Sequence, residues 1–530
     1  MKRIGRVIIA CLSLLLMEFP LHSEESNDSN WKDEALFYIF SMNNRFEIKR
    51  NFLNSEKPDA LSFSDKTTGY YLYAGGTLMW FISDALDFNL SVNSGILKLK
   101  NIYYENKETY TTINNESATE YARKSLFIDE LYIEYDDSFK LGLGKANTTV
   151  ATDFVFNDYV FFIRTDFYLY KQAKRRLTLG IQFNTVDGSF TTDYKSSPML
   201  SADISYKDGK RFNISLFSLF LYDNDSAFGK IYEPFIEAFV VKKLKEAGQD
   251  TSQLCGGDIS GCIKADSNGY LLWGGVDLKG KYNAFSYKLD IILNYGDMEI
   301  VPYLDINGQI INIYNKKKMS GKVIQYLKYG DTDMGGTSGG GTTAYGSLLN
   351  KELSNKKILG YLIYSEVGYK FIKLLELSPY FLIMSGENNL EKSGYLNSFV
   401  SVKSYITTSN IFFNGGLNET ASSRNFSLSG VNGRGIISAG IWLRLKEDDS
   451  PFKMNLGAMK FYSQSSNINN KYDYGTEIDF VTSYGFTKFL ELSLEADYFI
   501  VGDFFKTDTE SVKNPFKLLL GLNLYLDNLD

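Results

Sequence analysis

The sequence predicts an all-β protein, a transmembrane antiparallel up-and-down β-barrel of roughly 16 to 20 strands. Three observations predict this class. Apolar and polar residues alternate with a period of two along most of the chain, as they do in β-strands with one face in lipid and one in a polar lumen. The connections between these runs are alternately short and long. No stretch beyond the N-terminus reaches the ~18 apolar residues that a membrane helix needs.

The clearest alternation lies near the C-terminus, in three successive runs at 476–484, 490–498 and 516–526. In the second run leucine, alanine and tyrosine side chains alternate without a break with glutamate, serine and aspartate side chains. Each run has the ~9 to 11 residues that a membrane strand needs to cross. We therefore expect these runs to be the closing strands of the barrel.

Similar runs recur upstream in pairs, which predicts hairpins with long polar loops between them. The expected hairpins are 127–135 with 139–143, 161–169 with 177–183, 200–206 with 212–220, 272–282 with 285–295, 361–371 with 377–384 and 437–445 with 452–458. The expected long loops are 101–124, 242–269, 330–355, 386–397 and 463–471. Short turns at one end and long loops at the other are typical of outer-membrane barrels. The alternation is blurred at 299–327 and 398–413, the weakest strand candidates.

Residues 1–23 predict a cleaved secretory signal peptide, because three basic residues precede the short apolar run 7–17. We expect residues 24–530 to form a single domain, since the chain has only 8 prolines and no proline- or serine-rich linker. Export and the barrel pattern together predict the outer membrane of a diderm bacterium. The formal net charge of −7 argues against a nucleic-acid partner.

The single histidine, His22, lies in the expected signal peptide. Hydrolases with a Ser-His-Asp or Cys-His site and zinc sites built on histidine are therefore excluded. We predict no enzyme activity, no cofactor and no metal site. One alternative is a carboxylate-pair hydrolase with Glu495 and Asp497 as its acid and base. These two residues would lie about 6.6 Å apart on one strand. Both side chains leave that strand in the same direction, whereas an acid and a base must flank a sugar from opposite sides.

Two stretches resemble the alginate-export porins of bacterial outer membranes. One runs through 475–484, 490–496 and Gly502-Asp503-Phe504-Phe505, and the other is the strand pair 131–135 and 140–145. The resemblance implies an eighteen-stranded monomeric barrel with a polar lumen. It does not extend to alginate, because exporters of that polyanion are expected to have an arginine- and lysine-rich constriction, whereas the inward faces here mix both signs.

Charged residues on the expected inward faces are the candidate pore-lining residues. They are Arg164, Asp166, Lys279, Lys288, Asp290, Arg444, Glu477, Asp479, Glu495 and Asp497. They either create a transverse electric field that filters solutes or only pair with one another in a polar, hydrated interior. Cys255 and Cys262 lie in a long polar loop, and an exported location favours a disulfide between them over free thiols or a metal pair.

The predicted function is a porin-like channel for passive passage of small or oligomeric polar solutes through a charged lumen. Two alternatives are a surface barrel that acts as an adhesin or structural protein through its long loops, and a transporter of hydrophobic compounds. The second would need an apolar lumen. The expected partners are outer-membrane lipid, the barrel-assembly machinery and a small polar or oligosaccharide solute.

Overall fold

The structure is a computed structural model of the chain. It describes residues 36–52, 65–83, 85–93, 97–99, 127–137, 139–150, 154–172, 174–185, 197–209, 211–223, 228–229, 263–306, 309–312, 324–326, 355–372, 374–387, 394–402, 408–413, 427–445, 450–466, 470–506 and 512–527. These residues belong to one compact unit, Leu36–Asp530. The predicted signal peptide and the predicted disulfide residues, Cys255 and Cys262, lie outside the described residues.

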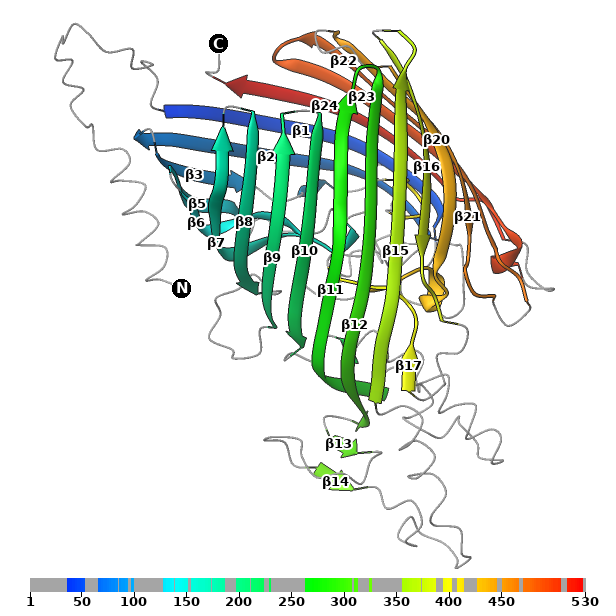
Figure 1. The fold of residues 1–530 in the computed structure, drawn as a ribbon. Coiled ribbons are helices and arrows are strands. Elements are labelled where there is room, and N and C mark those ends of the chain that lie inside the picture. The colour runs from blue at the N-terminus through cyan, green and yellow to red at the C-terminus, as the bar shows by residue number, and fades with distance from the viewer. Residues whose placement is uncertain are drawn as a thin grey trace, which may run out of the picture. The chain divides into compact units, whose positions relative to one another are not determined.

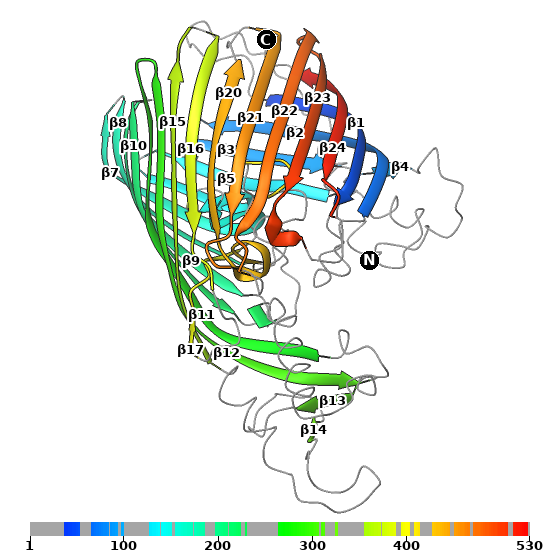
Figure 2. The same ribbon diagram turned by 90° about the vertical axis from the view of Figure 1, so that its right-hand side faces the viewer.

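Eighteen long strands form a closed antiparallel barrel in which each strand pairs with its neighbours along the chain (Figures 1 and 2). They are β1 (Leu36–Phe52), β2 (Asp65–Ser83), β3 (Leu86–Asn93), β5 (Phe127–Asp136), β6 (Phe139–Val150), β7 (Phe156–Gln172), β8 (Arg175–Thr185), β9 (Pro198–Asp208), β10 (Phe212–Asp223), β11 (Ile263–Tyr282), β12 (Phe285–Ile306), β15 (Asn355–Lys370), β16 (Leu375–Met384), β20 (Ile436–Leu445), β21 (Phe452–Tyr462), β22 (Asp473–Thr487), β23 (Leu490–Val501) and β24 (Phe516–Asp527). The ring closes because β1 pairs with β24 from Ile39 to Arg50. The predicted fold class is confirmed.

Short elements lie at the ends of these strands or inside the ring. The short strands are β4 (Leu97–Leu99), β13 (Gln309–Asn312), β14 (Ile324–Tyr326), β17 (Gly394–Leu396), β18 (Val400–Ser401) and β19 (Ser427–Leu428), and the 3-10 turns are η6 (Val431–Gly433) and η7 (Asp503–Phe505). Among the described strands, β18 and β19 pair only with each other. β17 adds a parallel partner to one end of β15. Within the described residues, no helix is both long and apolar enough to cross a bilayer.

The two ends of the barrel differ as predicted. At one end all eight connections are short, such as the β9–β10 turn with Gly209 at φ 55° and the β11–β12 turn with Asn283 at φ 53°. Glycine and asparagine adopt this left-handed conformation at low cost, which explains their use there. The connections at the other end, here called the loop end, are mostly long. β11 and β12 continue past their neighbours on that side (Figure 2).

Two sequence predictions need correction. The expected loop 242–269 is too long, because β11 already begins at Ile263. The weak candidate 398–413 is not a barrel strand: its described residues form only the two-residue strand β18 and an irregular segment. Its backbone bonds to side chains inside the barrel rather than to a neighbouring strand, for reasons given below.

The two faces of the wall carry different chemistry. On β24, Leu518, Leu520 and Leu522 point outward and are exposed, whereas Lys517 and Asn523 point inward and are buried. This alternation places an apolar surface around the outside of the ring and a mostly polar surface around the turn-end half of the lumen. Nearer the loop end, many inward side chains of the wall are apolar and covered, and they form one cluster with residues of the connecting segments.

Candidate functional site in the barrel lumen

One pair of the predicted lumen residues belongs to a bridge across three strands. The guanidinium of Arg164 on β7 lies 2.8 Å from Asp166 on the same strand and 3.0 Å from Asp203 on β9. The bridge passes over Gly180 of β8, where an added Cβ would come within 2.6–2.7 Å of all three side chains. Glycine on β8 therefore makes room for an ion pair between β7 and β9.

The predicted residues on β11 and β12 form a second charged group. Asp277 pairs in register with Asp290, and Lys279 pairs with Lys288, so like charges face each other across the strands. Each lysine reaches back along its own strand, since Lys279 lies 3.2 Å from Asp277 and Lys288 lies 3.8 Å from Asp290. These four residues largely neutralise one another.

Arg444 on β20 lies in a third group. Its guanidinium lies 2.6 Å from Glu366 on β15, 3.6 Å from Glu376 on β16 and 2.8 Å from the Ser378 hydroxyl. The arginine therefore joins three neighbouring strands of the wall. The predicted acidic residues of β22 and β23 have other contacts.

The acidic residues of β22 and β23 bind a segment of the chain that lies inside the barrel. This segment belongs to the connection between β16 and β20, whose described parts, 385–387, 394–402, 408–413 and 427–435, we call the crossing loop. Glu477 is 0% exposed and accepts hydrogen bonds from the backbone N–H groups of Asn410, Ile411 and Phe412 at 2.8, 2.6 and 2.8 Å. A carboxylate that accepts several N–H groups forms strong, charge-assisted bonds.

Asn410 also binds the two other carboxylates of this group. Its backbone N–H donates to Asp479 at 3.1 Å, and its side-chain amide donates to Asp497 at 3.0 Å. Glu495, the fourth predicted acidic residue, instead forms an ion pair with Lys517 of β24. The acidic sector of the wall therefore holds the crossing loop and a lysine.

An aromatic contact fixes the same end of the crossing loop. Phe412 is fully buried and stacks on Phe461 of β21 with ring centres 4.3 Å apart. Tyr474 and Phe499 lie 5.3 and 6.0 Å from the Phe412 ring. Such ring pairs add to the hydrophobic stabilisation of the docked segment.

The other end of the crossing loop binds a distant part of the wall. Trp273 on β11 donates its indole N–H to the carbonyl of Val400 at 2.8 Å, and the Val402 N–H donates to the Val155 carbonyl just before β7 at 2.8 Å. β7 and β22 lie eight strand pairings apart one way around the ring and ten the other way. The loop therefore spans the lumen between nearly opposite walls.

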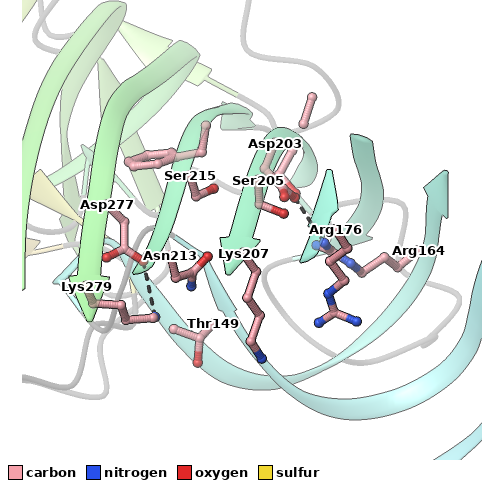
Figure 3. A pocket seen from close by; sticks show the side chains of 13 residues that line it. Thr149, Arg164, Arg176, Asp203, Ser205, Lys207, Asn213, Ser215, Asp277 and Lys279 are labelled. Atoms are coloured by element: carbon pink, nitrogen blue, oxygen red, sulfur yellow. Dashed lines mark hydrogen bonds and ion pairs between the residues drawn. The ribbon is translucent and has the colours of Figure 1, made fainter. Parts of the chain in front are cut away.

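A cavity of about 340 Å³ lies along the inner wall of β6–β11 (Figure 3). Its lining residues are Thr149, Arg164, Arg176, Ser201, Ala202, Asp203, Ser205, Lys207, Asn213, Ser215, Phe217, Asp277 and Lys279. Arg176 and Lys207 face each other in register across β8 and β9. Neither has an ion-pair partner within the described part of the chain, in contrast to the two acidic residues, Asp203 and Asp277.

Sequence reasoning missed Arg176 and Lys207 because each lies one residue outside an expected strand. The observed strands β8 and β9 include them, and the alternation then turns both side chains inward. Like charges directly opposite each other destabilise a sheet, so this pair favours an anion between them. Among the described residues, no group of three or more Asp, Glu, Cys or His side chains could hold a metal ion.

No known protein family is matched by this chain, and no curated protein is detectably similar to it. Several solved structures are similar to it over most of its length. OccAB1 of Acinetobacter baumannii is 10% identical over 95% of this chain and 100% of its own, with a TM-score of 0.47. OccK11 (OpdR) of Pseudomonas aeruginosa is 8% identical over 93% and 96%, with a TM-score of 0.46. A BenF-like porin from Pseudomonas fluorescens Pf-5 is 9% identical over 93% and 99%, with a TM-score of 0.44.

Proposed function

We propose that the chain is an outer-membrane channel that allows passive passage of small polar solutes through a charged lumen narrowed by its own crossing loop. Residues 1–23 would be removed on export. One observation carries this proposal: a closed barrel with an apolar outside encloses a charged inner wall, and a segment of the same chain spans the space between. A loop fixed across a polar lumen restricts the size of what passes, and the wall charges then select by sign.

The membrane location follows from the outside of the ring. The outward side chains of β24, β23 and β7 include exposed leucine, isoleucine and phenylalanine residues. In water, a continuous apolar surface of this size would be unfavourable by about 25 cal/mol per Å². In a bilayer the same surface contacts lipid, and the pairing of β1 with β24 closes the ring.

The charge pattern favours anions among the solutes. Arg176 and Lys207 lack acidic partners within the described residues, whereas the acidic residues of β22 and β23 are occupied by the crossing loop and Lys517. A small carboxylate or phosphate would relieve the repulsion between Arg176 and Lys207 as it passed. The resemblance to alginate-export porins adds anionic oligosaccharides to the solutes that should be tested.

The hydrophobic-compound alternative has less support. Apolar inward side chains such as Trp273 and Phe461 are fully buried, because the crossing loop and its neighbours cover them. An adhesin with a plugged lumen would conduct no ions, so the conductance measurement below separates it from a channel.

The proposal is tested by reversal potentials across planar bilayers in a potassium chloride gradient. We expect the wild-type barrel to conduct and to prefer chloride. The variant R176Q/K207Q should lower the anion-to-cation permeability ratio by about twofold to tenfold, since it removes both unpaired charges. The control K174Q/K513Q removes two charges outside the cavity and should leave the ratio close to wild type. Absence of conductance in the wild type, or an equal effect of both double variants, would contradict the proposal.

A further inference from the structure

A second cavity, of about 400 Å³, opens on the outward face of the barrel near the loop end of β15; we call it the outer pocket. It is lined by Leu293, Leu359, Gly360, Tyr361, Ser385, Gly386, Asn397 and Gln464. Leu293 of β12 and Leu359 of β15 are 61% and 54% exposed and point outward. The pocket is therefore continuous with the apolar surface that faces lipid.

The outer pocket exists because the wall is incomplete beside β15. β16 ends at Met384, opposite Leu362, whereas β15 continues to Asn355. The parallel strand β17 lies alongside β15 only at Lys356–Ile358, beyond the gap (Figure 1). The floor of the gap is the crossing loop, since a Cβ on Gly360 would lie 2.7 Å from the Phe399 Cα atom.

One side of the outer pocket is polar. The Gln464 carbonyl accepts from the Gly386 backbone N–H, and its amide donates to the Tyr361 hydroxyl, both at 2.5 Å. Lys357 is exposed and shares the outward face of β15 with Leu359 and Tyr361. Within the described residues Lys357 has no ion-pair partner. The pocket thus has apolar side chains on one side and a free cation about 6.6 Å beyond Leu359 on the same strand.

The position of the pocket along β15 matches the boundary between lipid chains and headgroups. Leu359 is 11 residues (370 − 359) from Lys370 at the turn end of β15. At ~3.3 Å per residue and a tilt of ~40°, this places Leu359 about 28 Å above the turn end. The apolar band of such barrels is about 25 Å tall, so Leu359 lies near its outer edge and Lys357 just outside it.

We propose that the outer pocket binds one anionic phospholipid-like amphiphile of the outer leaflet, with an acyl chain against Leu293 and Leu359 and its phosphate at Lys357. The inference rests on the proposed membrane location. The charge of Lys357 complements the phosphate, and the gap in the wall accepts a chain that a complete β-sheet would exclude. Gln464 and Asn397 lie where the ester or sugar groups of such a molecule would be.

The test is native mass spectrometry of the purified full barrel, stripped of bulk lipid by detergent exchange and titrated with dioleoyl phosphatidylglycerol. We expect one saturable lipid per wild-type barrel. Lys357→Gln should weaken its binding about tenfold, the loss expected for one charge-assisted contact. Leu359→Asn should weaken it similarly by removing the apolar contact. Lys513→Gln, an exposed lysine at the same end of the barrel but outside the pocket, should bind as the wild type does.

Equal lipid binding by the wild type, Lys357→Gln and Leu359→Asn would overturn the inference, and so would an equal loss in Lys513→Gln. Displacement of the lipid by millimolar inorganic phosphate would also overturn it, because the site would then recognise a free anion. Bilayer conductance of Lys357→Gln should equal that of the wild type, since this side chain faces outward. A barrel that binds the lipid but does not conduct would contradict the channel function and leave the outer pocket supported.

Discussion

Replacing Glu477 with glutamine should release the crossing loop from the wall. Glu477 accepts three backbone N–H groups through two carboxylate oxygens, and it is completely buried. Glutamine keeps one acceptor oxygen and places an amide N–H₂ against at least one of the backbone donors. A lost charge-assisted bond costs about 1.5–3 kcal/mol, so the undocked population should rise about tenfold to a hundredfold.

Single-channel recording in planar bilayers measures this release. We expect E477Q to show frequent transitions to a larger conductance level, and liposome swelling assays should admit larger sugars. Glu491→Gln is the matched control, because Glu491 lies on β23 and hydrogen-bonds Asn523, away from the crossing loop. If E477Q folds but keeps the wild-type conductance, noise and size limit, the crossing loop does not restrict the lumen.

Two further predictions concern the wall. Gly180→Ala should displace the Arg164 bridge to Asp166 and Asp203 and lower the free energy of unfolding by about 1 kcal/mol, measured as the urea midpoint of barrel unfolding on gels. The control Gly274→Ala should be neutral, because its Cβ would have no neighbour closer than 3.9 Å. Equal midpoints for the two variants would refute the steric argument. Arg444→Met should leave Glu366 and Glu376 without their cation, lower the free energy of unfolding by about 1–3 kcal/mol and shift ion selectivity toward cations. The double variant R444M/E366Q should recover part of the lost stability. No recovery would contradict the pairing.

The strands were predictable because their signal is local. A period of two over nine or more residues is visible in the sequence at 476–484 and 490–498, and both runs lie in observed strands that pair in the expected hairpin. The turns were equally local, since Gly209 marks its own turn. Strand ends were less predictable: the polar start of β11, from Ile263 to Gly269, has a loop-like composition but pairs with β12.

The site depended on contacts that no local pattern contains. The Arg164–Asp203 ion pair joins residues 39 positions apart, and it requires the register of three strands as well as the glycine between them. The bond from Asn410 to Glu477 joins residues 67 positions apart. An inward glutamate on a strand can face water, a lysine or backbone N–H donors. The apolar/polar alternation of the sequence is the same in all three cases, so it does not distinguish them.

This difference changes the charge balance of the lumen. Counted along the sequence, Glu477, Asp479 and Asp497 form a negative sector that would repel anions. In the structure, N–H groups of the crossing loop donate hydrogen bonds to all three carboxylates. The dipoles of these N–H groups therefore compensate part of the negative charge. Release of the crossing loop would therefore widen the lumen and also expose negative charge. For this reason E477D, which keeps the charge but shortens the side chain, should conduct more and prefer cations more than the wild type does.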